Sequence, residues 1–269
     1  MSSSLAIRLA ETGTDWIDTP TPAADILTAL LAAGRRFFES PMQDKQRHAA
    51  VTTMTGWRSV GVEYSQSPDR PDLNETFCFR LRDDDQRDAS GETPLLEYCR
   101  NAQRVLDAVA AATLDELAHH LGVLHRVDHV RTAQESWLQL NWSRPASAPR
   151  EFIQDAHEDG HLITLLLADA PGLEVRDRRA GWVGVTPGPQ RLICFAGECG
   201  ALLTDDAVSP MQHRVRAHAD VPTRLSVAYF INPDLDQQLD PWIPGVRNQG
   251  VDLLRWGQQN PARFGLPTL

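Results

Sequence analysis

The sequence predicts a mainly β protein of the sandwich or jelly-roll type with flanking helices. Two observations lead to this prediction. After residue 159, short apolar runs of strand length follow one another, each bounded by glycine, proline or aspartate turn signals. One much longer segment, from Thr93 to Gly122, instead carries apolar residues at helical spacing. The 269 residues, of which 42% are hydrophobic and 23% charged, suit one large globular core.

Two helices are predicted in the first half of the chain, on either side of a segment at 51–90 made of loop and short strands. The first covers residues 20–39, because two prolines mark its start and Pro41 follows its end. The second begins at Thr93 as N-cap, with Pro94 in the first turn, and ends at Gly122. At 1.5 Å per residue the second helix would be roughly 40 Å long, which is enough to brace one sheet from outside.

The strands are delimited by turn residues and by alternation. One strand is predicted in QESWLQLNWSRP from Gln134, and the later ones cover 161–167, 173–176, 182–185, 191–196, 201–204, 212–218 and 224–231. A short helix followed by an irregular tail is predicted from Val251. We expect a single domain over residues 1–269. Its parts would be a helical and loop segment at 1–135, a jelly-roll core with the candidate site at 136–232, and a tail at 233–269.

The composition limits the partners. A net charge of -10 and a pI near 5.3, with Lys45 as the one lysine among 26 basic residues, argue against nucleic acid, which requires clustered cations. The start of the chain has no apolar segment of signal-peptide length, and no apolar run is long enough to cross a membrane. We therefore expect a cytoplasmic protein that acts on a small molecule. Four cysteines in so long a chain do not form a disulfide framework.

Three residues in the β region form a candidate metal site. His157 and Asp159 are two residues apart, so their side chains would leave the same face of an extended strand. A second imidazole is available from His213, which a hairpin or two of intervening strand can bring close. Two histidines and one carboxylate on one side of a cation leave the opposite positions open. Non-haem Fe(II) oxygenases use this arrangement to bind a chelating co-substrate and then dioxygen.

A candidate carboxylate receptor follows in TRLSVAYFI. Arg224 and Ser226 again share a strand face by the period of two. A guanidinium with a neighbouring hydroxyl binds a carboxylate through charge-assisted hydrogen bonds.

The segment from His157 to His161 also fits the metal-binding motif of a zinc hydrolase. His157, Glu158 and His161 match H-E-x-x-H, in which both histidines lie on one face of a helix and the glutamate is the general base. That interpretation requires a helix through Gly160, and glycine costs a helix interior about 1 kcal/mol relative to alanine. The following LITLLL is a short apolar run of strand length, which favours the strand.

At these residues the chain resembles the isopenicillin N synthase-like branch of the 2-oxoglutarate/Fe(II)-dependent dioxygenases. The family pattern is H-x-D, some fifty-odd residues, H, about ten residues and R-x-S, and it falls on His157, Asp159, His213, Arg224 and Ser226. Framework segments match as well: FFESPMQDKQR from Phe37, GWRSVGVEY from Gly56, DLNETFCF from Asp72, LNWS with Asn141, GLEV from Gly172, Trp182 and HRV from His213. The resemblance covers most of the chain.

The resemblance implies a double-stranded β-helix, a cupin-like jelly roll, braced by the long helix and with a metal at one mouth. It implies Fe(II), 2-oxoglutarate and O2 as cofactor and co-substrates, with the C5 carboxylate at Arg224 and Ser226. The implied activity is that of an oxidoreductase that hydroxylates, desaturates or cyclises a small molecule at an unactivated C–H bond. We expect a role in bacterial specialised metabolism such as antibiotic biosynthesis. A 2-oxoglutarate-independent Fe(II) oxidase of the same family stays open as an alternative.

Five further positions are assigned through the resemblance. Asn141 begins the family's N-Y-Y-P motif and is predicted at the co-substrate, although Trp142 and Ser143 replace the tyrosines. Either Arg224 and Ser226 suffice for the carboxylate, or the pocket is rebuilt. The predicted substrate-lining residues are Arg58, Phe77, Phe79 and Trp137, with Arg58 as a candidate anchor for a substrate carboxylate. The alternative places the two phenylalanines in a strand core and the arginine on the surface.

Overall fold

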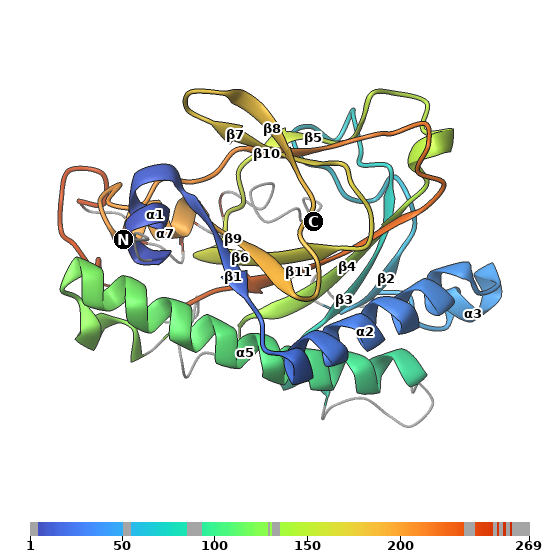
Figure 1. Cartoon of the computed structure of the whole chain (residues 1–269), viewed down its shortest axis with the longest axis horizontal. Coiled ribbons are helices and arrows are strands. Elements are labelled where there is room, and N and C mark those ends of the chain that lie inside the picture. The colour runs from blue at the N-terminus through green and yellow to red at the C-terminus, as the bar shows by residue number, and fades with distance from the viewer. Residues whose placement is uncertain are drawn as a thin grey trace.

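The computed structural model describes residues 5–50, 55–84, 93–128, 130, 135–233, 240–249, 252, 255, 256 and 259. Two antiparallel sheets face each other (Figure 1). The larger has the order β1-β9-β6-β11-β4-β3-β2 and the smaller the order β5-β10-β7-β8. This is the jelly-roll architecture with flanking helices that the sequence predicts. Most of the predicted helix from Val251 lies outside the described residues.

The strands have the following bounds: β1 Thr14–Asp18, β2 Gly56–Arg58, β3 Asn74–Phe79, β4 Trp137–Ser143, β5 Phe152–His157, β6 Ile163–Ala168, β7 Leu173–Asp177, β8 Gly181–Val185, β9 Arg191–Ala196, β10 His213–Arg216 and β11 Arg224–Ile231. The helices are α1 Leu5–Thr12, α2 Thr21–Glu39, α3 Met42–Gln46, α4 Leu81–Asp84, α5 Pro94–Leu121 and α7 Glu198–Leu203, with short 3-10 turns at Leu124–Arg126 and Pro145–Ser147.

Helices α2 and α5 cover the outer face of the larger sheet (Figure 1). The predicted bounds of α5 are confirmed: Pro94 occupies the first turn and Gly122 closes the helix in the left-handed region at φ 70°. The Thr93 side chain makes no capping hydrogen bond, so only the backbone part of the predicted N-cap is present. Apolar residues of both helices join those of the sheet in one buried core. No helix of the described part is long and apolar enough to span a membrane.

Strand β6 explains why LITLLL has no alternation. It lies between β9 and β11 in the larger sheet, and all six of its residues are buried. One face packs toward the helices and the other toward the smaller sheet, so both faces are buried and mainly apolar, with Thr164 as the polar side chain of the second face.

Two parts of the sequence-based prediction need correction. The predicted strand at 201–204 is instead the end of α7, a short helix in which all six residues are buried. A short buried apolar run does not distinguish strand from helix by its periodicity. In addition, α1 and β1 precede the first predicted helix, and β1 completes the larger sheet by pairing with β9. The segment TDWID is too short and too polar to have predicted this strand.

The start of α7 is packed tightly against the loop after β5. A Cβ atom on Gly197 would lie 2.1 Å from the backbone oxygen of His161 and 2.7 Å from that of Asp159. Backbone amides at this point bind the loop: Glu198 donates to the Asp159 oxygen at 2.8 Å, and Gly197 donates to the Leu162 oxygen at 3.1 Å. The loop therefore has a fixed position against α7.

This packing predicts that Gly197→Ala lowers the free energy of unfolding by about 1–3 kcal/mol, the usual cost of overpacking, because backbone atoms must move. Urea denaturation of both proteins measures the change. Gly184→Ala is the matched control: Gly184 lies on β8 with no atom within 4 Å of the added Cβ. That variant should be neutral or stabilised by about 0.5–1 kcal/mol. Equal stability of the two variants would show that the close approach at Gly197 has no energetic weight.

Candidate functional site

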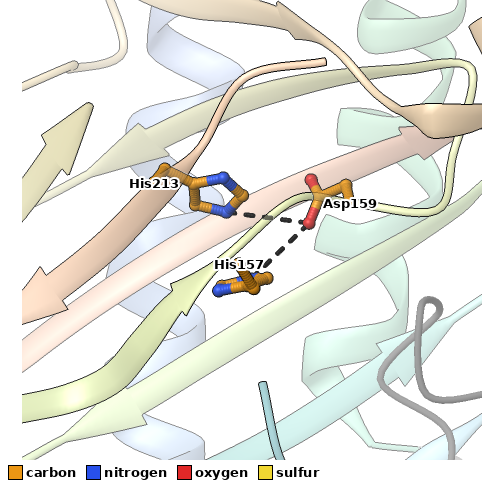
Figure 2. Close-up of side chains that lie close together, drawn as sticks. All are labelled: His157, Asp159 and His213. Atoms are coloured by element: carbon orange, nitrogen blue, oxygen red, sulfur yellow. Dashed lines mark ion pairs between the residues drawn. The ribbon is translucent and has the colours of Figure 1, made fainter. Parts of the chain in front are cut away.

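Three side chains converge between the two sheets. His157 ends β5, His213 begins β10, and the two residues are paired directly across these antiparallel strands. The Asp159 carboxylate lies between them, with its Oδ1 atom 3.7 Å from His157 Nε2 and 3.6 Å from His213 Nε2 (Figure 2). One ligand atom from each residue lies within 4.8 Å of the others, so the group could hold a metal ion.

The local geometry at Asp159 differs from the predicted one. Strand β5 ends at His157, and Asp159 belongs to the loop that follows, so the two side chains do not share a strand face. The loop instead turns the carboxylate toward the imidazoles, and the backbone of α7 holds it there.

Hydrogen bonds orient each of the three side chains. The Nδ1 atom of His157 lies 2.8 Å from the Asp155 carbonyl oxygen, and that of His213 lies 3.2 Å from the Met211 carbonyl oxygen. Each Nδ1 therefore carries the proton, and each Nε2 is left to bind a metal. The second oxygen of Asp159 accepts a hydrogen bond from the Thr164 hydroxyl at 2.5 Å.

The protonation states also suit a metal site. Burial lowers the pKa of His213 to about 4, and repulsion from His157 acts in the same direction, so the His213 ring is neutral near pH 7. Burial would raise the pKa of Asp159, but His213, His157, His161 and the Thr164 hydroxyl together lower it below the usual range. A neutral imidazole and an ionised carboxylate are the forms that bind metals.

The structure does not support the zinc-hydrolase alternative. That motif requires a helix from His157 to His161, whereas the chain passes from strand into loop. His161 is not part of the three-residue cluster: its Nδ1 lies 3.0 Å from Asn232 Oδ1 and its ring packs against Trp137 and Phe230. Gly160 lies in the loop without starting a helix.

A buried guanidinium lines the same cavity. Arg224 is 2% exposed and donates through Nη1 to Ser226 Oγ at 2.9 Å, as their shared strand face predicts. Its Nε and Nη2 atoms are buried without a hydrogen-bond partner among the described residues. Burial lowers the pKa of Arg224 to about 10, which still leaves it charged at neutral pH. A buried charge with two unused donors fits an anionic ligand.

Asn141 lies beside this pair. It is opposite Ser226 on β4, lines the cavity, and accepts hydrogen bonds at Oδ1 from Asn74 and Gln139. Trp142, which replaces a family tyrosine, packs on the other side of the sheet against Phe38, with the Arg35 guanidinium over its ring. The change at position 142 therefore lies outside the cavity.

The four predicted substrate residues are not among those that line this cavity. Phe77 and Phe79 are fully buried in the hydrophobic core, which agrees with their alternative assignment. Trp137 is also buried and packs on His161. Arg58 is neither on the surface nor facing the cavity: it is 8% exposed and bonded to Glu63 and Cys78.

Other residues form the cavity wall instead. The sequence pattern did not predict a place in the site for these polar side chains: Glu63, Tyr64, Ser65, Asp72, Gln139, Gln154 and Thr164. Their signal was weak, because the loop at 63–72 has no periodicity. Gln139 alone could have been found, since it shares a strand face with Asn141.

Both parts of the site fit the groups implied by the sequence. Two imidazoles and one carboxylate form the two-histidine, one-carboxylate set of non-haem Fe(II) sites. The unpartnered Arg224 donors in the same cavity fit a carboxylate such as that of 2-oxoglutarate.

Comparison with known proteins agrees with this chemistry. The family described as 2OG-Fe(II) oxygenase superfamily matches residues 134–233. A UPF0676 protein of Schizosaccharomyces pombe is 30% identical over 85% of this chain and 76% of its own length. Validamycin A dioxygenase of Streptomyces hygroscopicus subsp. limoneus is 27% identical over 81% of this chain and 67% of its own.

A solved structure shows the same fold. A full-length Neurospora crassa protein, solved in complex with alpha-KG, superposes with a TM-score of 0.76 at 18% identity, over 94% of this chain and 87% of that protein. The curated relatives are matched over shares of their own length that range from 27% to 76%. The sequence matches and the shared fold show that the chain belongs to the 2OG-Fe(II) oxygenase superfamily, whose enzymes use Fe(II), 2-oxoglutarate and dioxygen.

Proposed function

We propose that this dioxygenase oxidises an unactivated C–H bond of a small molecule, by hydroxylation, desaturation or ring closure. His157, Asp159 and His213 hold Fe(II), and Arg224 and Ser226 bind 2-oxoglutarate. One observation carries the proposal. The three potential metal ligands line the same cavity as the buried Arg224 guanidinium, two of whose donors have no partner among the described residues.

The charges of the site explain how its residues work together. Asp159 offsets one of the two charges of Fe(II), so the site attracts a dianionic chelator. Arg224 and Ser226 then fix the far carboxylate of 2-oxoglutarate, and Asn141 borders the same part of the pocket. Bound Fe(II) with 2-oxoglutarate and dioxygen supplies the oxidising chemistry, and the protein selects the C–H bond that is presented to it.

A 2-oxoglutarate-independent oxidase is the second candidate. Ser143 stands where relatives carry a tyrosine, on the strand face that also presents Asn141. In that case Arg224 would bind a carboxylate of the substrate itself. The two unpartnered donors of Arg224 fit either carboxylate, so the test is the requirement for a 2-oxoacid.

We place the reaction in bacterial specialised metabolism, such as antibiotic biosynthesis. The support is the similarity to Validamycin A dioxygenase of Streptomyces hygroscopicus over most of this chain. The polar cavity, with a carboxylate or amide at several wall positions, suits a small polar molecule.

The proposed function predicts succinate release from 2-oxoglutarate that requires Fe(II). Protein stripped with a chelator should be inactive, and Fe(II) but not Zn(II) should restore succinate formation, measured with and without a panel of small molecules. Zn(II)-dependent hydrolysis of amide or ester substrates would contradict the proposal. Full turnover of a substrate without any 2-oxoacid would identify the oxidase alternative.

We expect removal of the Asp159 carboxylate to abolish metal binding. Asp159→Ala should abolish stoichiometric Fe(II) binding and turnover, because the two remaining imidazoles supply no negative charge to the cation. Fe(II) content after desalting and initial rates of succinate release measure both effects. Glu158→Ala is the neighbouring control and should have a much smaller effect, since Glu158 is not part of the three-residue cluster. The opposite ranking of the two variants would reject this ligand set.

We expect truncation of the Arg224 side chain to weaken 2-oxoglutarate binding. Arg224→Ala removes one partner of a buried charge pair, which costs about 2–5 kcal/mol, or roughly 30- to several-thousand-fold in 2-oxoglutarate affinity. Arg224→Lys should rescue only part of this loss, because an ammonium lacks the planar fork. Ser226→Ala removes one hydrogen bond to a charged group, about 1.5–3 kcal/mol.

Titration calorimetry without oxygen gives these affinities, and Fe(II) content serves as the control. All three variants should keep their iron, because neither side chain is a metal ligand. If 2-oxoglutarate affinity is unchanged in Arg224→Ala, this clamp does not bind the co-substrate.

A further inference from the structure

The cavity beside the three-residue cluster carries two carboxylates that the proposed chemistry does not use. Glu63 and Asp72 both line it, and both are buried, with 8% and 4% of their surface exposed. They stand at the two ends of a loop, and the Asp72 amide donates to the Glu63 carbonyl oxygen at 2.8 Å. This backbone contact keeps the two carboxyl-bearing residues together.

Arg58, the predicted anchor for a substrate carboxylate, is not among the residues that line the cavity. Its Nη1 atom donates to Glu63 Oε1 at 3.2 Å and to Cys78 Sγ at 3.1 Å, behind the cavity wall. Its charge is therefore already offset by Glu63, and the side chain that reaches the cavity is the acid. An anionic substrate group would meet a carboxylate there.

The remaining hydrogen bonds of Glu63 leave it able to bind a ligand. Thr76 Oγ1 donates to Oε1 at 2.8 Å, and Gln139 Nε2 donates to Oε2 at 3.0 Å. With Arg58, three donors reach a group that offers about four acceptor positions. The open position belongs to Oε2, which has only the Gln139 contact among the described residues.

Electrostatics favours a cation between the two acids. Burial raises the pKa of Glu63, and repulsion from Asp72 adds to this, while Arg58 and Thr76 oppose the change. Among the described residues, the hydrogen-bond donors to Asp72 are neutral: the Ser65 amide at 3.2 Å, the Ser65 hydroxyl at 2.9 Å and Gln154 Nε2 at 3.4 Å. Burial raises the pKa of Asp72, and the nearby His157 opposes this change. A positive charge placed near both carboxylates would relieve the repulsion and the cost of burial.

The residues around the entrance to the cavity are also acidic or neutral. A polar depression of about 560 Å³ adjoins the cavity at Ser65 and His157, and Glu158, Glu198, Gln66 and Gln212 also line it. Among the described residues that line the cavity and this depression, Arg224 is the single lysine or arginine, and the proposed function assigns it to 2-oxoglutarate. The approach to the metal thus carries acidic and neutral polar groups.

We propose that the substrate is a small molecule that carries a protonated amine, which binds to Glu63 and Asp72 while the C–H bond to be oxidised faces the metal. This inference rests on the proposed function, because it takes the cavity as the active site. Recognition is by charge: the ammonium donates to carboxylates whose other hydrogen bonds fix them in place.

The test compares molecules that differ in one charged group. The Fe(II)-loaded protein with 2-oxoglutarate, kept without oxygen, is titrated with matched amine, alcohol and acid triples. Two such triples are glucosamine, glucose and glucuronate, and cyclohexylamine, cyclohexanol and cyclohexanecarboxylate. Saturation-transfer NMR and calorimetry at millimolar concentrations give the dissociation constants. The amine should bind about tenfold or more tightly than the alcohol, and the acid should bind most weakly.

Three variants assign the preference to residues. Asp72→Asn and Glu63→Gln should each reduce the preference for the amine about tenfold or more. Glu63→Gln leaves the buried Arg58 without its acidic partner, so the folding of this variant is checked by thermal melting. If Glu63→Gln is unfolded, the amine preference of Asp72→Asn alone is the test. Glu39→Gln, which removes an exposed acid on α2 outside the cavity, should keep the full preference.

Two outcomes overturn the inference. The first is a failure of the amine preference: the alcohols or acids bind as tightly as the matched amines or more tightly, or the amines do not bind at millimolar concentration. The second is an amine preference that is unchanged in Asp72→Asn. A 2-oxoglutarate titration of the same sample distinguishes failure of this inference from failure of the proposed function. If 2-oxoglutarate binds but the amine preference is absent, this inference fails and the proposed function stands. If 2-oxoglutarate does not bind, the proposed function itself fails.

Discussion

The antiparallel pairing of β10 with β5 is the contact on which the rest of the site depends. It places His213 opposite His157, although 55 residues lie between them in the sequence. The intervening chain forms β6, β7, β8, β9 and α7, which add strands to both sheets and return the chain to the same point. A shift of this register by one residue would turn one imidazole to the opposite face of the small sheet. Strand β10 also pairs with β7, where His213 lies opposite Val175, a member of the buried cluster between the sheets. The core and the candidate metal site are therefore linked through this strand.

The loop between β5 and β6 is fixed by a second, independent set of contacts. Its carbonyl groups accept hydrogen bonds from the first amides of α7, and the absence of a side chain at position 197 allows this close approach. The loop therefore holds Asp159 as firmly as a strand would. Thr164, from the buried strand β6, completes the arrangement through its bond to the carboxylate.

The sequence predicted what depends on local pattern and on the order of the motif. Strand β11 was predicted with its observed bounds, 224–231, because turn residues delimit it, and period two correctly paired Arg224 with Ser226. The same rule selected His157 and Asp159 as neighbours, but on a strand that ends before Asp159. The partners of Arg58 could not be predicted, since Glu63 reaches it across a loop without periodicity. The helix at α7 was missed because burial on all sides removes the amphipathic signal.

The unpartnered donors of Arg224 have a consequence for the whole molecule. In the free protein a charged group lies almost entirely out of water with two hydrogen-bonding atoms unused, which is an unfavourable state. A ligand that satisfies these atoms binds the folded chain and not the unfolded one, so its binding free energy adds to the free energy of unfolding. With 2-oxoglutarate as that ligand, as proposed above, co-substrate concentration and resistance to unfolding would be thermodynamically linked through this one side chain. The fold would then be at its most stable in the co-substrate-bound form.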